Sequence, residues 1–481
     1  MELVRRTKII ATLGPASASR ELIAEMVRSG VDVFRLNFSH GDWDEHRERM
    51  EDIRAIEAEV GWPLGVLQDL QGPKIRTGTF AASGGVELRE GTTFRLTTDL
   101  SPGDETRVGT TLPELVAELE PGQRLLLNDG LVELLVTARE PGALVTQVIY
   151  GGYLSDHKGI NVPEADLSVP ALSAKDLHDL EYGVSLGVDW VALSFVRRPS
   201  DLKEARAALD RLGSRAKLMA KIEKPGAVTR FEEILAEADG VMIARGDLGV
   251  EMPPEDVPVV QRHIISRSIE AGKPVVVATQ MLESMIHNPR PTRAEASDVA
   301  NAIYEGADAV MLSGETAVGR YPLEAVRMMD RVAKEVEASP NYAERLYSFP
   351  LQEGPSIPHA VCHSACRIAQ ILPAEVIASF TWTGSTAWRV ARYRPRAMVV
   401  ALTPFEKVAR QLTVGWGIVP LTAPDPTSTD RMTAQAIERL RAAGIAEPGQ
   451  TMVLTAGVPF GQSGTTNMVR VERLGEQQPG G

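Results

Sequence analysis

The sequence predicts an α/β protein built around a closed (β/α)8 barrel, with an all-β lid domain inserted after the third barrel strand and a doubly wound α/β domain at the C-terminal end. Three observations lead to this fold class. Eight short β-branched runs alternate with helical patterns, one long interval carries only strand and turn signals, and a new strand–helix alternation follows a segment rich in proline, serine and charge. A chain of 481 residues has room for several domains of roughly 100–200 residues each.

The eight runs have the composition of strands in a parallel sheet that is buried on both faces. Such strands are nearly continuous in apolar residues and are each followed by a helix, and eight of these units close into a barrel. The glycines Gly30 and Gly61 end the first two helical patterns, as is typical of helix C-termini. The expected strands are Thr7–Leu13, Val31–Phe38, Leu64–Leu70, Trp190–Phe195, Lys217–Glu223, Gly240–Ala244, Pro274–Met281 and Ala309–Thr316.

The interval between Leu70 and Trp190 interrupts the barrel pattern. Alternating strand patterns there are divided by turn signals, which stand at Ser83–Gly85, Pro102–Asp104, Asn128–Gly130 and Pro141–Gly142. A domain inserted after the third strand lies over the C-terminal face of the barrel, where barrel enzymes carry their active sites. We therefore expect a lid.

The C-terminal part of the chain begins after an expected linker at Ser339–Pro358. Its helices are expected at Ala360–Leu372 and Ser385–Tyr393 and between Ser428 and Gly444, and its strands at Glu375–Phe380, Ala397–Leu402, Thr451–Leu454 and Met468–Val471. We assign residues 1–73 and 161–346 to the barrel, 74–160 to the lid and 347–481 to the C-terminal domain.

The composition excludes several classes of function. Apolar residues make up 43% of the chain and the net charge is −13, so a packed core is expected and nucleic acid, which needs a basic face, is not an expected partner. No apolar run reaches the roughly 18 residues of a membrane span. The two cysteines, Cys362 and Cys366, give no disulfide framework, and we expect a cytoplasmic protein.

Charged residues mark the C-terminal ends of the barrel strands. Arg35 alternates with apolar neighbours, so its side chain is expected in the barrel mouth, where it needs either a structural carboxylate or a bound phosphate as its partner. The third strand ends in Asp69, and Lys74 and Arg76 follow at the entry to the lid.

Lys221 and Glu223 are two positions apart at the end of the fifth strand and therefore face the same way. Asp247 follows the sixth strand, and neighbouring strands lie only about 4.8 Å apart. Two carboxylates without histidine or cysteine favour Mg²⁺ or Mn²⁺ over zinc. A surface pair of acids is the alternative.

Hydroxyl groups and one more carboxylate end the last two strands, at Thr279, Ser313 and Glu315. They are suited to hold water or relay a proton, or simply to cap the chain. Together these residues predict a metal-assisted reaction of a small phosphorylated or carboxylated compound, because metal and cations neutralise phosphoryl charge while a lid excludes water.

At these residues the chain closely resembles the pyruvate kinase family over nearly its whole length. The matching stretches are Thr7–Ile9, Arg35–Gly41, Gly72–Pro73, Lys158–Gly159, Lys221–Glu223, Ala244–Gly249, Ala278–Leu282, Asn288–Glu295 and Met311–Glu315. The resemblance implies Mg-dependent phosphoryl transfer from phosphoenolpyruvate to ADP, giving pyruvate and ATP. It also implies a homotetramer.

The resemblance implies a role for each site residue. Glu223 and Asp247 look like the Mg²⁺ ligands, Lys221 like the group that stabilises the phosphoryl and enolate oxygens, and Arg35 like the grip on the phosphate. Substrate contacts are implied for Gly246, Asp247 and Thr279. Nucleotide contacts are implied for Asn37, Phe38, Ser39, His40, Arg76 and Lys158, the last from the lid, and a second Mg²⁺ would arrive with ADP. A water relay near Thr279, Ser313 and Glu315 is our hypothesis for protonation of the enolate.

The chain departs from the pattern of many family members at the third strand. Those members carry Thr and Glu at the positions of Leu70 and Lys74 and require potassium, and their monovalent site resembles Asn37, Ser39, Asp69 and the residue at Leu70. A lysine ammonium is a compact cation on a flexible stem. Lys74 is expected to replace K⁺, so activity should not require potassium, as in a similar lysine-bearing branch of the family.

The C-terminal domain resembles the regulatory domain of the family. The run Thr381–Thr386 passes from a strand into a helix N-terminus, and the loop at Ser463–Asn467 is expected to close over it. A phosphorylated effector held by Thr381, Thr383, Gly384, Ser385 and Thr386 is one reading, and a capped helix without a ligand is the other.

Two competing functions remain. A metal-dependent lyase or aldolase acting on a pyruvate enolate also sets acids on adjacent barrel strands, but it has no need of Lys158 on a lid or of Arg76. A non-catalytic homologue is expected to have lost Lys221, Glu223 or Asp247, and all three are present.

Overall fold

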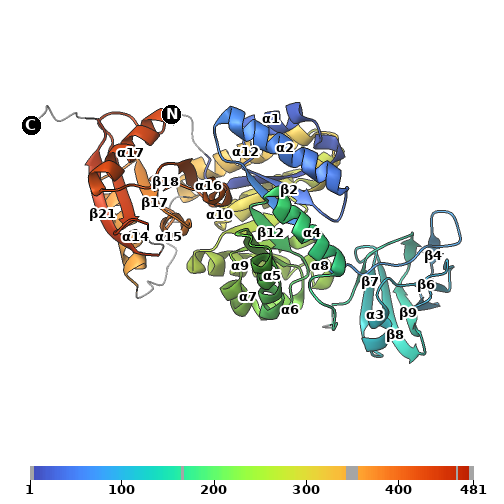
Figure 1. The fold of residues 1–481 in the computed structure, drawn as a ribbon. Helices are drawn as coiled ribbons and strands as arrows, with labels where there is room; N and C mark the ends of the chain where they lie inside the picture. Colours follow the sequence, from blue (N-terminus) through green and yellow to red (C-terminus); the bar gives the residue numbers. More distant parts are fainter. Residues whose placement is uncertain (1–4, 164–166, 343–355, 462–463, 476–481) are drawn as a thin grey trace, which may run out of the picture.

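The computed structural model describes residues 5–163, 167–342, 356–461 and 464–475. Figure 1 shows three bodies in a row, with the barrel in the middle, the lid at one end and the C-terminal domain at the other. The expected boundary near residue 346 and most of the expected linker lie outside the described residues.

Eight parallel strands close the central barrel, in the order β1-β16-β15-β14-β13-β12-β3-β2. This is the (β/α)8, or TIM, barrel that the sequence predicts. One strand, Gly240–Ala244, has the expected bounds, and the other seven are one to four residues shorter than expected. Most of the difference lies at their C-terminal ends, where the chain turns into the loops that carry the site. They are β1 (Lys8–Leu13), β2 (Val33–Asn37), β3 (Gly65–Asp69), β12 (Trp190–Leu193), β13 (Lys217–Ile222), β14 (Gly240–Ala244), β15 (Val275–Ala278) and β16 (Ala309–Leu312).

An outer ring of helices covers the barrel and buries its apolar residues against the strands. The longer helices are α1 (Arg20–Arg28), α2 (Trp43–Val60), α4 (Ala174–Leu186), α5 (Pro199–Arg211), α7 (Phe231–Glu237), α9 (Val257–Ala271), α10 (Arg293–Tyr304) and α12 (Pro322–Ala338). Short helical turns follow several strands, namely η1 (Pro15–Ser17), α6 (Pro225–Thr229), α8 (Arg245–Glu251), η2 (Glu283–Ile286) and α11 (Gly314–Ala317). Asp247 therefore lies in the first turn of α8 rather than in a strand.

The lid has a core of its own around Phe94, Leu125 and Leu134. A six-stranded sheet in the order β11-β7-β8-β9-β5-β6 lies beside a two-stranded sheet of β10 and β4. The elements are β4 (Val86–Leu88), β5 (Thr93–Thr97), β6 (Arg107–Gly109), α3 (Pro113–Glu118), β7 (Arg124–Leu127), β8 (Val132–Glu140), β9 (Ala143–Tyr150), β10 (Gly152–Leu154) and β11 (Ile160–Asn161). Three of the expected turn signals separate these strands, and the fourth, Ser83–Gly85, comes directly before β4.

The C-terminal domain has a five-stranded sheet in the order β19-β18-β17-β20-β21, in which only β21 is antiparallel. Helices cover both faces, which confirms the predicted fold class. The elements are α14 (Ile357–Ile371), β17 (Val376–Phe380), α15 (Ser385–Ala391), β18 (Met398–Thr403), α16 (Glu406–Leu412), β19 (Ile418–Thr422), α17 (Thr429–Ala442), β20 (Thr451–Gly457) and β21 (Thr466–Arg473).

The C-terminal domain closes the floor of the barrel, at the N-terminal ends of its strands. Val414 and the ring of Trp388 pack into the apolar cluster that fills the barrel interior. The indole of Trp190 in β12 donates to the carbonyl of Gln411 at 3.0 Å. Arg394, which is 2% exposed, pairs with Asp308 at 3.0 Å. The floor is therefore sealed, and the opposite end of the barrel faces the lid.

No helix in the described ranges has both the length and the apolar run that a bilayer span requires.

Candidate active site

A chain of ion pairs crosses the C-terminal mouth of the barrel. Arg35 Nε lies 2.7 Å from Asp69 Oδ2, Lys221 Nζ lies 3.2 Å from Asp69 Oδ1, and Lys221 Nζ lies 2.8 Å from Glu223 Oε1. The spacing argument for Lys221 and Glu223 thus agrees with their contact. Arg35 takes the carboxylate partner that the sequence left open, and its Nη1 also donates to Thr12 Oγ1 at 3.0 Å.

Ser194, just after β12, is a member of this network that the sequence did not reveal. Lys221 Nζ donates to its hydroxyl at 2.8 Å, and the hydroxyl donates to the carbonyl of Leu70 at 2.7 Å. Both Ser194 and Asp69 are almost fully buried. A single serine after an apolar strand has no sequence signal, so only its position beside Lys221 identifies it.

Burial and neighbouring charges set the protonation states in this network. Burial alone would lower the pKa of Lys221, but Asp69 and Glu223 outweigh it and the pKa is raised. Burial alone would raise the pKa of Asp69, but the positive charges of Lys221 and Arg35 hold it below its usual value. Both groups are therefore ionised at neutral pH.

The acid pair behaves differently. Burial raises the pKa of Glu223, the charge of Lys221 opposes that rise, and the nearby Asp247 adds to it. The second oxygen of Glu223 accepts the backbone N–H of Phe195 at 2.7 Å. Two carboxylates that repel each other favour a bound cation. Within the described residues, no group of three or more His, Cys, Asp or Glu side chains could hold a metal ion on its own. A cation here would need ligands from substrate or water.

The loops after β14 and β15 meet at Thr279. Its hydroxyl accepts the N–H of Gly246 at 2.7 Å and donates to the carbonyl of Ala278 at 2.6 Å. Thr279 has φ +66° and Gln280 has φ +53°, a conformation that costs non-glycine residues strain and is often found at functional sites. Arg245 holds this turn by donating to the Thr279 carbonyl at 3.0 Å. No role for Arg245 is expected from the sequence alone.

Glu315 is fully buried, and backbone groups occupy both of its oxygens. Leu282 N donates to Oε1 at 3.0 Å and Ser313 N donates to Oε2 at 2.7 Å. Its carboxylate thus braces the loops after β15 and β16. The hydroxyl oxygen of Ser313 is buried and has no protein partner in the described chain.

The loop after β2 and the start of the lid bring positive charge together. Partial burial lowers the pKa of His40, and the charges of Lys74, Arg76 and Arg35 lower it further. These three positive charges therefore act on the His40 ring. An anion such as a nucleotide phosphate would relieve their mutual repulsion.

Lys158 lies beside Arg76 where the chain crosses into the lid. Its backbone N–H donates to Thr77 Oγ1 at 2.9 Å, and the carbonyl of Lys158 accepts Thr77 N at 2.8 Å. Arg76 donates to the carbonyl of His157 at 3.1 Å. A cavity opens next to this crossing, and its walls include Lys74, Asn161, Phe195, Lys224 and Asp247. Residues of both the lid and the barrel therefore line the space beside Asp247.

The expected monovalent region is built from the same loops. Asn37 Oδ1 accepts the N–H of Ser39 at 3.1 Å, and the carbonyl of Asp69 accepts the N–H of Phe38 at 3.0 Å. Leu70 contributes a buried apolar side chain and a carbonyl that Ser194 already occupies.

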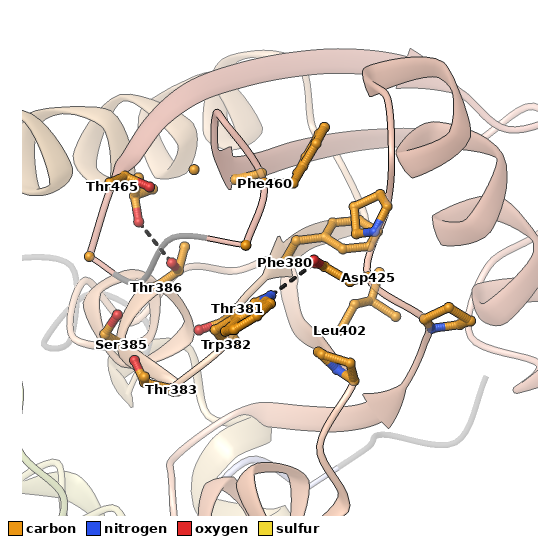
Figure 2. Close-up of a pocket in the computed structure, with 18 residues that line it drawn as sticks. Phe380, Thr381, Trp382, Thr383, Ser385, Thr386, Leu402, Asp425, Phe460 and Thr465 are labelled. Carbon is orange, nitrogen blue, oxygen red and sulfur yellow. Dashed lines mark hydrogen bonds between the residues drawn. The ribbon is translucent and has the colours of Figure 1, made fainter.

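A second cavity lies in the C-terminal domain (Figure 2). Its walls include Thr381, Thr383, Ser385 and Thr386 of the expected effector loop, whereas Ser463 lies outside the described residues. Trp382 crosses the cavity and donates to Asp425 Oδ1 at 2.9 Å. No lysine or arginine of the described chain lines it.

A (β/α)8 barrel whose mouth gathers carboxylates with a lysine and an arginine has the charged groups that suit an enzyme of phosphoryl transfer. The family model "Pyruvate kinase, barrel domain" matches residues 4–326, and "Pyruvate kinase, alpha/beta domain" matches residues 359–472. The chain belongs to the pyruvate kinase family.

Full-length relatives agree with this assignment. Proteins named "Pyruvate kinase" from Methylorubrum extorquens, Agrobacterium vitis and Mycobacterium tuberculosis are 48%, 47% and 46% identical to the chain. Each alignment covers 98% of this chain and 98%, 97% and 99% of the respective relative. The activity is phosphoryl transfer from phosphoenolpyruvate to ADP with a divalent metal.

Proposed function

We propose that the barrel mouth performs this transfer with Mg²⁺ held by Glu223 and Asp247, and with Lys221 and Arg35 on the phosphoryl group. The observation that carries the proposal is the buried network in which Arg35, Asp69, Lys221 and Glu223 contact one another. These contacts hold the four side chains in place before substrate arrives, and they keep Lys221 and Asp69 ionised, which supports the preorganisation that phosphoryl transfer needs.

The donor set fits Mg²⁺. Glu223 and Asp247 offer only carboxylate oxygens, which suit hard divalent cations, and Mg²⁺ commonly takes one or two carboxylates together with substrate phosphates and water. Asp247 raises the pKa of the buried Glu223, so a shared cation would stabilise both ionised groups. When bound, the metal would neutralise charge on the carboxylate and phosphoryl oxygens of the substrate.

The chain's own side chains then have distinct tasks. Lys221 would donate hydrogen bonds to the transferring phosphoryl group and to the developing enolate oxygen, while Asp69 and Ser194 keep its ammonium in place. Arg35 would hold the phosphate through guanidinium N–H groups that its bonds to Asp69 and Thr12 leave over. Asn37, Ser39, His40, Arg76 and Lys158 would hold the nucleotide phosphates, and Phe38 would shape their loop.

Protonation of the enolate would run through water near Thr279 and Ser313, with Gly246 holding Thr279. The unpartnered hydroxyl of Ser313 is suited to bind such a water. Glu315, whose two oxygens accept backbone N–H groups from Leu282 and Ser313, would hold these loops in place beside the relay.

The direct test is pyruvate release from phosphoenolpyruvate and ADP as Mg²⁺ is titrated. We expect activity with Mg²⁺ or Mn²⁺, and Glu223→Gln should raise the half-saturating Mg²⁺ concentration by at least about tenfold. Absence of pyruvate under every condition, including added sugar phosphates and nucleotides, would move the assignment to the lyase or the non-catalytic homologue.

We also propose that Lys74 replaces K⁺. Lys74 follows the end of β3 at the entry to the lid, its charge helps to lower the pKa of His40, and Leu70 offers no side-chain oxygen. In tetramethylammonium buffer, activity should change by less than about twofold on adding K⁺. Lys74→Glu should lose most activity without K⁺ and regain part of it with K⁺. Wild-type activity that appears only with K⁺ would refute this role and leave the reaction itself intact.

Three further assignments are proposals from the family: a homotetramer, a cytoplasmic location and a phosphorylated effector in the C-terminal cavity. The hydroxyls of Thr381, Thr383, Ser385 and Thr386 and the N–H of Gly384 would have to hold the phosphate, because the described cavity walls carry no lysine or arginine. Thermal shifts with sugar phosphates and nucleotides, compared between wild type and Thr383→Val, test the effector site.

A further inference from the structure

The lid is joined to the barrel by two chain segments, and one carboxylate holds both of them. The outgoing segment leaves the barrel at Gly72, and the returning segment ends at Ser173, which caps the N-terminus of α4. Asp176 Oδ1 accepts the N–H of Gly72 at 3.0 Å. Asp176 Oδ2 accepts the N–H of Ser173 at 2.9 Å and its hydroxyl at 2.5 Å.

Asp176 is fully buried. Burying a carboxylate costs free energy unless its oxygens accept hydrogen bonds. We call the two segments that join lid and barrel, near Gly72 and near Ser173, the lid stalk, and each oxygen of Asp176 accepts from one of them. The carboxylate also lies in the first turn of the 13-residue helix α4, where the helix dipole favours negative charge. The two segments are thus fixed to each other, because moving either one away would leave a buried carboxylate oxygen without its hydrogen bond.

The outgoing segment has little freedom at this point. Gly72 has φ +69°, and a Cβ on it would lie 2.9 Å from the ring of Phe195. The carbonyl of Gly72 accepts the N–H of Lys74 at 2.8 Å. A shift of the Gly72 peptide would therefore displace Lys74.

The same helix holds the loop that follows β2. Lys175 Nζ donates to the carbonyl of Phe38 at 2.8 Å, and Trp43 Nε1 donates to Asp179 Oδ1 at 2.9 Å. Tyr182 stacks on Trp43 with ring centroids 4.7 Å apart and donates to the Trp43 carbonyl at 2.8 Å. Successive turns of α4 thus contact the lid stalk and the Asn37–Trp43 loop through hydrogen bonds and ring stacking.

We propose that Asp176 is a positioning residue for the reaction. Through α4 it sets the spacing between the lid stalk, which carries Lys74 and Arg76, and the loop that carries Asn37 to His40. It touches no substrate itself. The inference rests on the nucleotide site proposed above, and it predicts that Asp176 governs the use of ADP more than the binding of phosphoenolpyruvate. Of the proposed phosphoenolpyruvate ligands only Arg35 lies on β2, and its guanidinium is held by Asp69 and Thr12. The others lie at the ends of β13, β14 and β15.

The test compares Asp176→Ala with Glu295→Ala in the full-length protein. Glu295 is a matched control, since its carboxylate joins two segments at the N-terminus of the barrel helix α10, by accepting from Ser284 N at 2.7 Å and Thr292 N at 2.7 Å, away from the lid. We expect D176A to raise KM for ADP at least about tenfold and to lower kcat, with Kd for phosphoenolpyruvate and Mg²⁺ unchanged within twofold. E295A should lower the melting temperature but leave KM for ADP within about threefold.

Equal kinetic effects of D176A and E295A, or a D176A enzyme with unchanged KM for ADP, would overturn the proposal. Pyruvate formation by the wild type tests the assigned reaction by itself. A failure of that assignment is therefore distinguished from a failure of the role proposed for Asp176. If D176A does not fold, hydrogen exchange of the wild-type protein tests the proposal instead. The Gly72 and Ser173 amides should exchange slowly and gain protection together when phosphoenolpyruvate, Mg²⁺ and ADP are added. Fast hydrogen exchange at both amides, or protection of only one of them, would refute the proposal that Asp176 holds the two segments together.

Discussion

Lys221 stands where two acids, a hydroxyl and the proposed phosphoryl position meet, so its charge serves both structure and chemistry. We predict that Lys221→Gln lowers kcat about 100-fold or more, because one preorganised cation is lost from the transition state. It should also lower the melting temperature, since Asp69 and Glu223 lose a buried partner. Steady-state assays and thermal melts measure both effects.

Lys217 provides the control for this change. It lies at the opposite end of the same strand, β13, and pairs with Asp239 at 3.2 Å. Lys217→Gln should leave kcat within about twofold of wild type. A K221Q enzyme with kcat as high as that of K217Q would contradict the role given to Lys221.

His46 predicts a pH dependence of stability. It stacks on Phe38 with ring centroids 4.1 Å apart, and its Nε2 lies 3.1 Å from the carbonyl of His40. Burial, then the charge of Arg49, lowers its pKa from 6.5 to about 4. The unfolded chain therefore takes up this proton first, and the stability from neutral His46 is present above about pH 6.5 and is lost as pH falls toward 4.

The expected size of this loss is on the order of 2 kcal/mol. His46→Gln, which keeps a donor for the His40 carbonyl but does not titrate, should lose less melting temperature than wild type between about pH 7.5 and 5. His178→Gln is the control because His178 is exposed on α4. An unchanged slope in H46Q would show that His46 does not carry this effect.

Residue spacing predicted part of the site and missed part of it. That Lys221 and Glu223 face the same way follows from strand alternation. For Arg35 the sequence predicted either a carboxylate or a phosphate as the partner, and a carboxylate is one of these two. Ser194 and Arg245 were not foreseen, because their roles depend on loops that approach from other strands. Which partner Arg35 takes is likewise a question of three-dimensional distance.

At the scale of elements, α4 and β3 approach each other closely at Gly183, where a side chain would displace the buried amide of Gln68. A Cβ on Gly183 would lie 2.1 Å from Gln68 Oε1, and Gln68 is itself buried and donates to the carbonyl of Asp179 at 2.6 Å. We predict that Gly183→Ala lowers the melting temperature by several degrees and raises KM for ADP, because α4 must move outward.

Gly249 in α8 gives the comparison for this element. Its Cβ would meet nothing closer than 3.8 Å, so Gly249→Ala should leave the melting temperature unchanged or raise it slightly through better helix propensity. If G183A melts no lower than G249A, the packing of α4 on β3 is looser than this geometry requires.

The sequence predicted helices and strands correctly where the apolar periodicity was strong, and it missed elements near the edge of the C-terminal sheet. The eight barrel strands and the helices between them follow the sequence pattern closely. In the C-terminal domain we did not expect α16 and β19. Pro420 interrupts the strand pattern of Ile418–Thr422, and it is tolerated there because β19 is an edge strand with no ladder to complete on its outer side.

At the scale of the whole molecule, Asp308 joins the barrel to the C-terminal domain. It accepts from Arg394 at 3.0 Å, from Trp416 N at 3.0 Å and from Val275 N at 3.0 Å, and the Arg394 guanidinium lies 4.9 Å from the centre of the Trp416 ring. Arg394→Met should cost about 3–5 kcal/mol, since it leaves a buried carboxylate without its cation. Thermal melts should show a drop of several degrees.

The double variant Asp308→Asn with Arg394→Met checks the interpretation. Removing both charges should destabilise the protein by less than the sum of the two single changes, because the two groups interact. Strictly additive losses would mean that the pair does not join the domains. Contacts of this kind could not be predicted from the sequence, which shows where domains divide but not which faces they share.

The sealed floor has a consequence for how the protein is made. About 100 residues separate the last barrel strand from Trp416, so a ribosome working at roughly 5–20 residues per second needs about 5–20 s to supply them. During that interval the barrel can close but its underside is still open to water. The growing chain therefore passes through a stage with an uncovered apolar floor, and correct completion depends on the last quarter of the polypeptide arriving before that surface meets another chain.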